Sequence, residues 1–367
     1  MSRIDDITKE SWLMSVFPEW GTWLNEEIEQ EKVQPGSVAM WWLGCTGVWI
    51  KTPGGCSITV DFWSGSGKRT HGNGMMEAGH QMANMSGSRT MPPNLRAIPM
   101  VLDPFAIKSV DAVLATHHHQ DHISPEAASH IVKSGMTTVD ENGHEIPVPF
   151  IGPRKAVELW QQWGVPEERC IAVRPGDSVR IKDIEIFVLD SFDRTCLITP
   201  DQTGTEYEDF TGKCPEDMDE KAVNYLIRTP GGTIYHGGDS HYSVGFARHG
   251  KAYDIDVAIG AFAENPVGVQ DKMTSLDILR MAEALRCKVI IPVHYDVWTN
   301  FMADVNEIRV LYHMRKDRLG YRFHPFFWEP GGKYVYPADR DKREYHHRRG
   351  FEDCFEAEQN VPFSAFL

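Results

Sequence analysis

Apolar and polar positions follow two periods along the chain, one typical of strands and the other of helices. Residues 111–116 (DAVLAT) and 288–293 (KVIIPV) are short apolar runs that predict buried strands, whereas 274–286 (TSLDILRMAEALR) and 304–318 predict helices. Residues 148–173 follow the order strand, helix, strand. The alternation of the two kinds of element predicts an α/β fold.

The N-terminal part predicts a helical arm followed by a hairpin. Residues 23–33 (WLNEEIEQEKV) carry helix formers and acidic charge, and a Pro-Gly pair ends the arm at residue 36. Residues 37–51 form one strand-like apolar run, and 56–62 alternate between apolar and polar. The turn TPGG between these two segments predicts that they pair as a hairpin.

The turn TPGG occurs twice, 177 residues apart, and each copy is followed by a strand-like segment that leads to an acid, Asp61 or Asp239. The strands that lead to His117 and His294 have the same offset. TPGG alone is simply a good turn sequence, so the prediction of a repeat depends on the agreement of the two offsets. Two similar halves with interleaved helices predict a four-layer αββα sandwich whose loops converge at one edge.

The domain organisation follows from these elements. We expect one catalytic domain over residues 37–335, preceded by the arm 1–36 and followed by a tail, 336–367, packed on the domain. Residues 64–97 are rich in Gly, Ser, Met and Asn, and 200–221 are polar and acidic. Neither segment shows a clear period, so both predict loop insertions within the domain.

Composition and charge exclude several classes of protein. Of 367 residues, 41% are hydrophobic and 24% charged, which is ordinary for a globular chain. The formal charge of -15 disfavours a nucleic-acid partner. The seven cysteines include no CxxC pair, so reduced thiols are expected rather than disulfides. The start of the chain has no signal-like apolar stretch, and no run reaches about 18 apolar residues, so a cytoplasmic protein without a membrane span is expected.

Residues 115–124 (ATHHHQDHIS) concentrate potential metal ligands directly after a buried strand. His117 and His119 share a face if the segment is extended, while Asp121 and His122 follow on the next turn of backbone, so the loop could serve two adjacent ions. Imidazole and carboxylate without nearby cysteine favour Zn, Mn or Fe. Asp121 could also orient a water molecule. A surface histidine cluster is the alternative, and the strand-loop-helix setting disfavours it.

The segment THHHQDH resembles the HxHxDH signature of the metallo-β-lactamase superfamily. In that superfamily a further histidine follows the strand at 185–190, but this chain has SFDRT there, and Asp193 is the expected replacement. Asp61 matches the first motif and is expected to support the site. The resemblance implies these further metal ligands: His117, His119, Asp121, His122, Asp239 and His294.

Nearly the whole chain resembles the family of L-ascorbate-6-phosphate lactonases. The similar segments are 10–31, 40–51, 101–117, 238–243 and 349–355. The resemblance implies that the lactone ring of L-ascorbate 6-phosphate is hydrolysed to 3-keto-L-gulonate 6-phosphate. It also implies manganese as the metal, with Zn or Fe as alternatives and one or two ions per site. A cytoplasmic homo-oligomer is implied as well, with a hexamer among the candidate assemblies.

Elementary chemistry leads to the same reaction. A divalent ion lowers the pKa of bound water and polarises an ester carbonyl, so metal-bound hydroxide would attack the lactone. His241 could donate a proton to the leaving oxygen, act as a further ligand, or be a packed neutral histidine. Lys68, Arg96 and Arg194 are candidate phosphate-binding residues, although a solvated surface charge is the favoured interpretation for each residue taken singly.

Two other functions use the same motif. The first is an RNA phosphodiesterase, which should have a basic groove or an inserted RNA-clamping domain, and the charge of -15 speaks against it. The second is a noncatalytic metal-binding protein, in which Asp193 would mark a decayed site. The joint presence of Asp61, Asp121, Asp239 and His294 disfavours decay, because a decayed site has no reason to keep water-orienting and bridging carboxylates.

Overall fold

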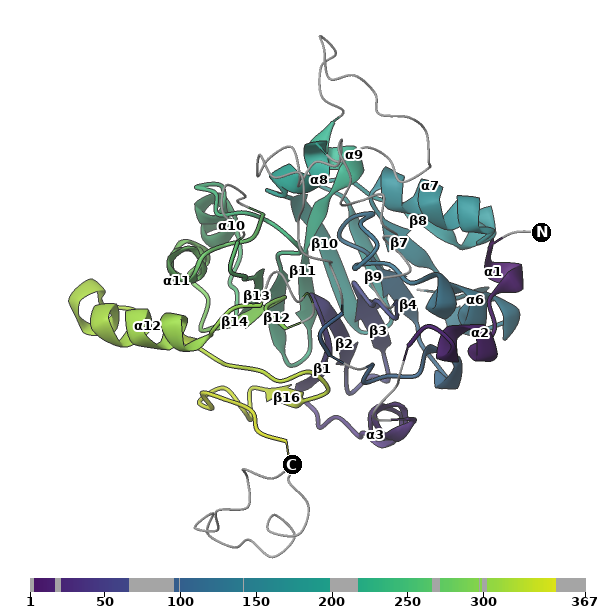
Figure 1. The fold of residues 1–367 in the computed structure, drawn as a ribbon, viewed down its shortest axis with the longest axis horizontal. Coiled ribbons are helices and arrows are strands. Elements are labelled where there is room, and N and C mark those ends of the chain that lie inside the picture. Colours follow the sequence, from purple (N-terminus) through teal and green to yellow (C-terminus); the bar gives the residue numbers. More distant parts are fainter. Residues whose placement is uncertain are drawn as a thin grey trace, which may run out of the picture.

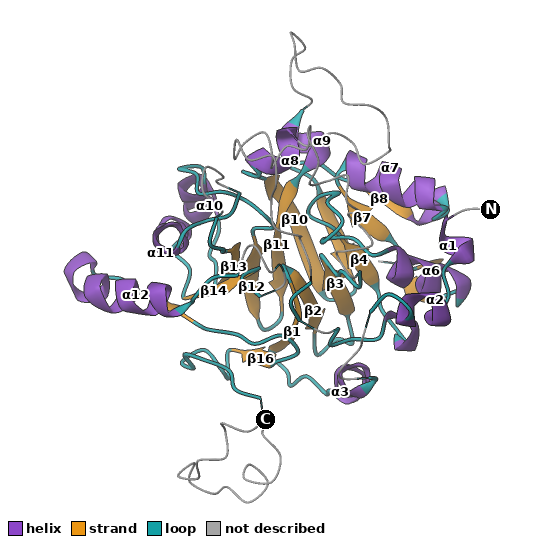
Figure 2. Cartoon of the chain, in the orientation of Figure 1, coloured by secondary structure: helices purple, strands orange, loops and turns teal. Residues whose placement is uncertain are grey.

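The computed structural model describes residues 3–16, 21–65, 96–98, 100–140, 142–198, 217–265, 271–296, 298 and 302–347. Two seven-stranded sheets pack face to face, and helices cover the outer face of each sheet (Figure 1). Figure 2 shows the strands in the centre and the helices on the two flanks. This arrangement confirms the predicted four-layer αββα sandwich.

The first sheet has the order β16-β1-β2-β3-β4-β7-β8. Its first four strands pair antiparallel, and β3, β4, β7 and β8 then pair parallel. The bounds are β16 Lys333–Tyr336, β1 Val38–Gly44, β2 Gly47–Lys51, β3 Ser57–Val60, β4 Ala112–Leu114, β7 Phe150–Gly152 and β8 Cys170–Ala172. A separate two-stranded ribbon is made of β5 Thr137–Val139 and β6 Glu145–Pro147.

The second sheet has the order β15-β14-β13-β12-β11-β10-β9. Strands β9 to β12 pair antiparallel, and β12 to β15 pair parallel. The bounds are β9 Ser178–Ile181, β10 Ile184–Asp190, β11 Val223–Thr229, β12 Gly232–His236, β13 Val257–Ala261, β14 Val289–Val293 and β15 His324–Pro325. Both sheets therefore change from antiparallel to parallel pairing after a TPGG hairpin.

Helices form the two outer layers. Those beside the first sheet are α1 Arg3–Asp6, α2 Lys9–Leu13, α3 Trp23–Gln30, α6 Pro125–Lys133 and α7 Arg154–Trp163. Those beside the second sheet are α10 Phe246–Ala252, α11 Ser275–Leu285 and α12 Asn306–Leu319. The short helices are α8 Arg194–Ile198, α9 Met218–Lys221, η2 Pro104–Ala106 and η3 Glu167–Arg169. Helix α6 begins as predicted, because the Ser124 side chain accepts from Ala127 N and Pro125 is its first residue.

The core lies in three layers that follow from the strand pattern. Trp42, Tyr225 and Ile259 are among the buried residues between the two sheets. Trp41 and Trp160 lie between the first sheet and its helices, and a third cluster lies under α10, α11 and α12. Because full burial of such a side chain is worth about 1.5–3 kcal/mol, the strands before the site are firmly anchored.

The prediction of one strand over residues 37–51 is wrong. The run forms two antiparallel strands, β1 and β2, with a tight turn at Cys45 and Thr46. Gly44 and Cys45 have φ of 93° and 54°, and this left-handed backbone reverses the chain within an apolar segment. Periodicity alone does not reveal such a turn, because both strands are buried on both faces.

The arm and the start of the tail both pack on the sandwich. Trp12 Nε1 of α2 donates to Ser64 O at 2.8 Å, and Leu24 of α3 is buried. Strand β16 crosses the expected domain boundary and pairs with β1 at the edge of the first sheet. Residues 66–95 and 200–216 of the two expected insertions lie outside the described residues. Within the described ranges, no helix is both long enough and apolar enough to cross a membrane.

Candidate metal centre

The loops that follow β3, β4, β12 and β14 meet at one edge of the sandwich. They carry Asp61, the histidine loop 117–122, Asp239 and His294. Parallel strands place their carboxyl ends on the same side of a sheet, so residues far apart in the sequence meet there. Asp61 and His294 have φ of 53° and 76°, which costs free energy for residues other than glycine. Such strain is typical of a functional site.

The first group of potential ligands consists of His117, His119 and Asp239, whose donor atoms lie within 4.8 Å of one another. His117 Nε2 lies 2.9 Å from His119 Nδ1 and 4.0 Å from Asp239 Oδ2. The HxH spacing places both rings on one side of the loop, as expected from the sequence. Three neutral or anionic donors facing one point form a pocket suited to a divalent ion.

The second group consists of Cys45, Asp121, His122 and His294, and all four residues are buried. His294 Nε2 lies 3.4 Å from Asp121 Oδ2, and His122 Nε2 lies 3.7 Å from Asp121 Oδ1. Cys45 Sγ lies 3.5 Å from Asp121 Oδ2. The indole of Trp298 donates to the same oxygen at 2.8 Å and fixes the orientation of this carboxylate.

Asp239 belongs to the first group and also lies close to residues of the second group. Its Oδ2 is 3.2 Å from His122 Nε2, and its Oδ1 is 3.5 Å from His294 Nε2. The preceding residue must be glycine, because Gly238 has φ of 48° and a Cβ there would lie 2.7 Å from Thr116 Oγ1. The segment GDS can therefore bring Asp239 close to the histidine loop.

The donor set fits a divalent metal. Four buried atoms in the two groups have no hydrogen-bond partner among the residues that the structure describes: His122 Nε2, Asp239 Oδ1, His294 Nδ1 and His294 Nε2. Buried polar atoms are normally paired, so these atoms indicate an absent partner. Three of them face the interior of the cluster through the short distances given above.

The pKa shifts of His122, His119 and Asp239 also indicate that this cluster favours a bound positive charge. Burial opposes ionisation of His122, but Asp239 and Asp61 outweigh it and raise the pKa of His122 well above its ordinary value. Burial lowers the pKa of His119 to about 4, which keeps that ring in the neutral form that binds metal. Burial tends to raise the pKa of Asp239, but Lys272 and His122 hold it well below its ordinary value. The Asp239 carboxylate therefore remains anionic and attracts a cation.

Asp61 supports the second group without facing a metal pocket. Its Oδ2 accepts from Thr46 Oγ1 at 2.9 Å and Thr116 Oγ1 at 2.7 Å, and it lies 2.9 Å from His122 Nδ1. Its Oδ1 accepts from Thr116 N at 2.7 Å. A carboxylate on the far nitrogen of a histidine fixes the tautomer that leaves Nε2 available as a ligand.

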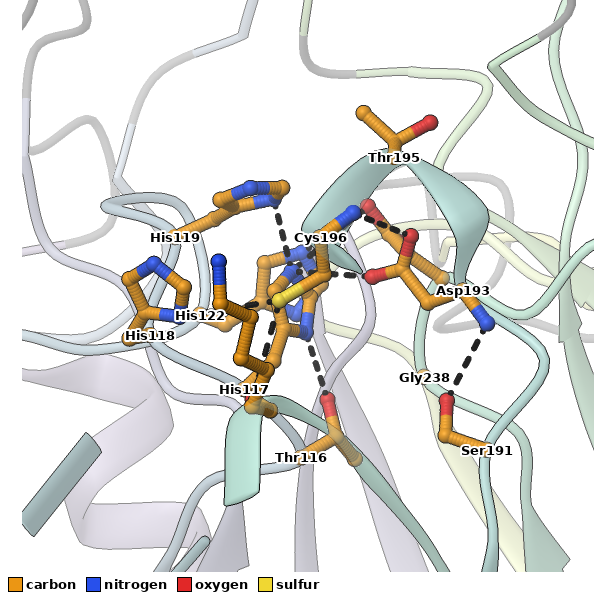
Figure 3. A network of polar contacts seen from close by, with 12 residues as sticks. Thr116, His117, His118, His119, His122, Ser191, Asp193, Thr195, Cys196 and Gly238 are labelled. Atoms are coloured by element: carbon orange, nitrogen blue, oxygen red, sulfur yellow. Dashed lines mark hydrogen bonds and ion pairs between the residues drawn. The ribbon is translucent and has the colours of Figure 1, made fainter. Parts of the chain in front are cut away.

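Asp193 lies beside the first group, on the opposite side from the histidine loop (Figure 3). Its Oδ2 is 3.7 Å from His117 Nε2, and its Oδ1 accepts from Cys196 N at 2.9 Å. Within the described part of the chain, Oδ2 has no hydrogen-bond partner. Burial and the nearby Asp239 raise the pKa of Asp193 to about 8. Asp193 belongs to neither of the two ligand groups, so its role as a ligand replacing the histidine stays a prediction.

The other predicted residues lie further out. His241 is buried, with Nδ1 accepting from Arg194 N at 3.3 Å and Nε2 3.5 Å from Thr195 Oγ1, which favours the packed-histidine alternative. The Arg194 side chain is exposed. Arg96 stacks on Trp63, with its guanidinium 4.7 Å from the ring centroid. Lys68 lies outside the described residues.

Three residues of the site were missed from the sequence: Cys45, Lys272 and Trp298. Lys272 is buried, and its Nζ lies 2.7 Å from Asp239 Oδ2 and 2.9 Å from Asp271 Oδ2. A lysine before a helix is usually a solvated charge, so the sequence around Lys272 does not predict its buried position at the site. Cys45 had a weak signal, since it lies within the GCTG segment between two strands.

Comparisons with known proteins agree with this geometry. The family model of the beta-lactamase superfamily domain matches residues 39–294. A probable L-ascorbate-6-phosphate lactonase of Escherichia fergusonii is 58% identical over 367 residues, with 100% of both chains covered. The protein of the same name from Escherichia coli O45:K1 is 57% identical over 369 residues, again with 100% of both chains covered.

A solved structure shows the same fold at low sequence identity. The "possible metal-dependent hydrolase" from Veillonella parvula aligns with a TM-score of 0.54 and 17% identity, over 81% of this chain and 98% of that chain. The family match covers the strands and loops that carry both ligand groups. The chain therefore belongs to the beta-lactamase superfamily and, within it, to the family of these probable L-ascorbate-6-phosphate lactonases.

Proposed function

We propose that this protein hydrolyses the lactone ring of L-ascorbate 6-phosphate to 3-keto-L-gulonate 6-phosphate, using divalent metal. The observation that carries the proposal is the full-length identity of 58% to a probable lactonase for this substrate, in a chain with two groups of potential metal ligands. The buried charges of the described residues at this edge are mainly carboxylates, which disfavours an RNA phosphodiester as the substrate.

The proposed ligands are the residues that the two groups bring together. A bound divalent ion supplies Lewis acidity and lowers the pKa of a water molecule. In our proposal Asp193 is a further ligand in the first group, and Asp239 is a ligand in both groups. The full proposed set is His117, His119, Asp121, His122, Asp193, Asp239 and His294.

The chain's own residues orient the reaction. Asp121 is held by Trp298 and can accept a hydrogen bond from an attacking water, which aligns that water with the lactone carbonyl. Burial of the cluster excludes bulk water and strengthens its electrostatic interactions. His241 remains a predicted proton donor to the leaving oxygen, and its contacts with Arg194 and Thr195 support a positioning role for the Asp193 loop instead.

Arg96, Arg194 and Lys68 remain the proposed phosphate-binding residues. Arg96 lies near the second group, because Trp63 stacks against Trp298 with ring centroids 4.9 Å apart. The exposed Arg194 follows the proposed ligand Asp193 directly. A guanidinium at the rim of a metal site suits a dianionic phosphate, which it can bind through two parallel hydrogen bonds.

Manganese is the proposed metal. If Asp193 replaces the histidine that the superfamily resemblance leads us to expect, the first group gains a carboxylate, and carboxylate donors suit Mn. Zn and Fe are the alternatives. We also propose a cytoplasmic homo-oligomer, with a hexamer among the assemblies to test by light scattering.

The test combines elemental analysis with a lactonase assay on one preparation. Metal-replete protein should bind transition metal and open the ring of L-ascorbate 6-phosphate, seen as loss of ultraviolet absorbance. Asp121→Asn and His122→Ala should lower kcat/KM by at least about 100-fold while the circular dichroism spectrum is kept. His144→Ala, at an exposed histidine, is the matched control. Metal-replete protein that leaves the ring closed would overturn the proposal.

A further inference from the structure

We propose that Cys45 supplies a thiolate donor to the divalent ion held by Asp121, His122 and His294, so that the two metal positions have different donor chemistry. The inference rests on the proposed metal-binding role of this edge and is independent of the substrate. The first group offers only imidazole and carboxylate, whereas the second would add sulfur.

The backbone holds Cys45 in a fixed and strained conformation. The residue follows β1 at φ of 54°, in the left-handed region that is costly for a side chain with a Cβ. Its carbonyl oxygen accepts from Trp42 Nε1 at 2.8 Å and from His294 N at 3.1 Å. These bonds join the β1–β2 turn directly to the loop that carries His294. The backbone of Cys45 is therefore held by the same contacts that place a proposed ligand.

The distances within the second group match those between ligands of one ion. Cys45 Sγ to Asp121 Oδ2 is 3.5 Å, and His294 Nε2 to the same oxygen is 3.4 Å. His122 Nε2 to Asp121 Oδ1 is 3.7 Å. Donors that lie about 2.0–2.3 Å from a tetrahedral ion are separated from one another by about 3.3–3.8 Å. The four side chains can therefore coordinate a single ion with little rearrangement.

A buried thiol that only packs against the core does not account for its surroundings. Such a thiol could donate to Asp121, but the Nε2 atoms of His122 and His294 would remain without partners in the described part of the chain. Trp63, Ala263 and Trp298 form an apolar wall around Cys45. Low polarity on this side strengthens the attraction between a cation and an anionic sulfur. An ion bound by the sulfur and both nitrogens satisfies all of these atoms together.

The expected consequence is a difference in metal preference between the two positions. Thiolate ligands favour softer ions such as Zn²⁺, whereas carboxylate-rich sites suit Mn²⁺. We therefore expect the second group to retain Zn²⁺ or Co²⁺ under conditions in which the first group exchanges with Mn²⁺. Cys45→Ser should lower the ratio of Zn²⁺ to Mn²⁺ affinity by about 10-fold or more.

The test is the absorption spectrum of cobalt-loaded full-length protein. The parent should show a sulfur-to-cobalt charge-transfer band in the near ultraviolet together with the visible bands of bound Co²⁺. Cys45→Ser and Cys45→Ala should lose the charge-transfer band and keep the visible bands. Cys287→Ser is the matched control, because Cys287 is also a buried thiol but lies under α11, where it donates to Ala282 O.

Each outcome separates the inference from the proposed function. A charge-transfer band that persists in Cys45→Ser, or that is absent from a parent with normal visible bands, overturns the role of Cys45 and leaves the proposed metal site standing. A parent that binds no cobalt overturns both. If Cys45→Ser fails to fold, Cys45→Ala and the parent spectrum decide the question.

Discussion

Lys272 Nζ lies 2.7 Å from Asp239 Oδ2, and both side chains are buried. The ammonium also lies 2.9 Å from Asp271 Oδ2, and the Lys272 backbone N–H donates to Asn265 Oδ1 at 2.8 Å. The loop before α11 thus places a permanent cation on the carboxylate between the two ligand groups. Lys272 contacts Oδ2 of Asp239, so the other carboxylate oxygen, Oδ1, can face His294.

Lys272→Met should destabilise the metal-free protein by about 3–5 kcal/mol, because it leaves two buried carboxylates without their cation. The measurement is the free energy of unfolding from urea titration in the presence of a chelator. Lys272→Arg keeps the positive charge and should lower the free energy of unfolding less than Lys272→Met does. Lys288→Met is the control, because its exposed pair with Asp256 should contribute at most about 1 kcal/mol. Equal losses for Lys272→Met and Lys288→Met would contradict the prediction.

Asp61→Asn should weaken metal binding by about 10- to 100-fold without removing a ligand, because His122 loses the carboxylate that fixes its tautomer. The measurement is the metal dissociation constant, obtained by competition with a coloured chelator. Asp111→Asn is the control, since Asp111 is another buried acid that accepts from Ser57 N and Thr138 Oγ1 away from the site. The role assigned to Asp61 fails if both variants bind metal like the parent.

The part of the site that could be predicted lies in contiguous motifs at strand ends. The segment 117–122 needs only a strand before it to direct its side chains to one edge, so its geometry follows from local sequence. Cys45 and Lys272 could not be predicted, because their positions depend on a left-handed turn and on a loop before a helix. Neither feature has a periodic signal.

The predicted repeat is correct for the two TPGG hairpins. It is wrong for the strands that lead to His117 and His294, which do not occupy equivalent positions in the two sheets. β4 pairs with β3 directly, and the strand that pairs in parallel with β12 is β13. β14, which carries His294, lies one strand further out and corresponds by position to β7. The 177-residue offset between His117 and His294 is therefore a coincidence of loop lengths. His294 follows β14 directly, and its backbone N–H donates to Cys45 O at 3.1 Å, which holds it at the site.

Protonation of His249 should lower the free energy of unfolding of the protein below about pH 6.5. Burial lowers its pKa, so the unfolded chain binds the proton more readily and the free energy of unfolding falls as the pH drops. The neutral ring lies 2.9 Å from Tyr235 OH, which accepts from Asn224 Nδ2 at 2.9 Å. Urea titrations at pH 7.5 and 5.5 should show a smaller difference for His249→Gln than for the parent.

The control for His249 is His313→Gln, because His313 is exposed on α12. It should keep the pH difference of the parent. The prediction is wrong if His249→Gln retains the full pH difference. A second readout is metal affinity, because Ser240, next to Asp239, donates to the Asn224 Oδ1 of the same network at 2.9 Å. His249→Gln should change that affinity less than Asp61→Asn does.

Metal removal should lower Tm, and variants of the proposed ligands should reduce this effect. At a free ion concentration about 100 times the dissociation constant, binding stabilises the fold by about 2.7 kcal/mol, which corresponds to about 3–4 °C for a chain of this length. The physical reason is that the ion relieves repulsion between Asp121 and Asp239 and satisfies the unpaired nitrogens of His122 and His294. Differential scanning fluorimetry with chelator, and again after Mn²⁺ is restored, measures the shift. His122→Ala combined with Asp121→Asn should show a smaller Tm shift than the parent, because the second group loses two proposed ligands while the first group keeps its own. A chelator effect of parental size in that variant would show that the stabilising ion binds elsewhere.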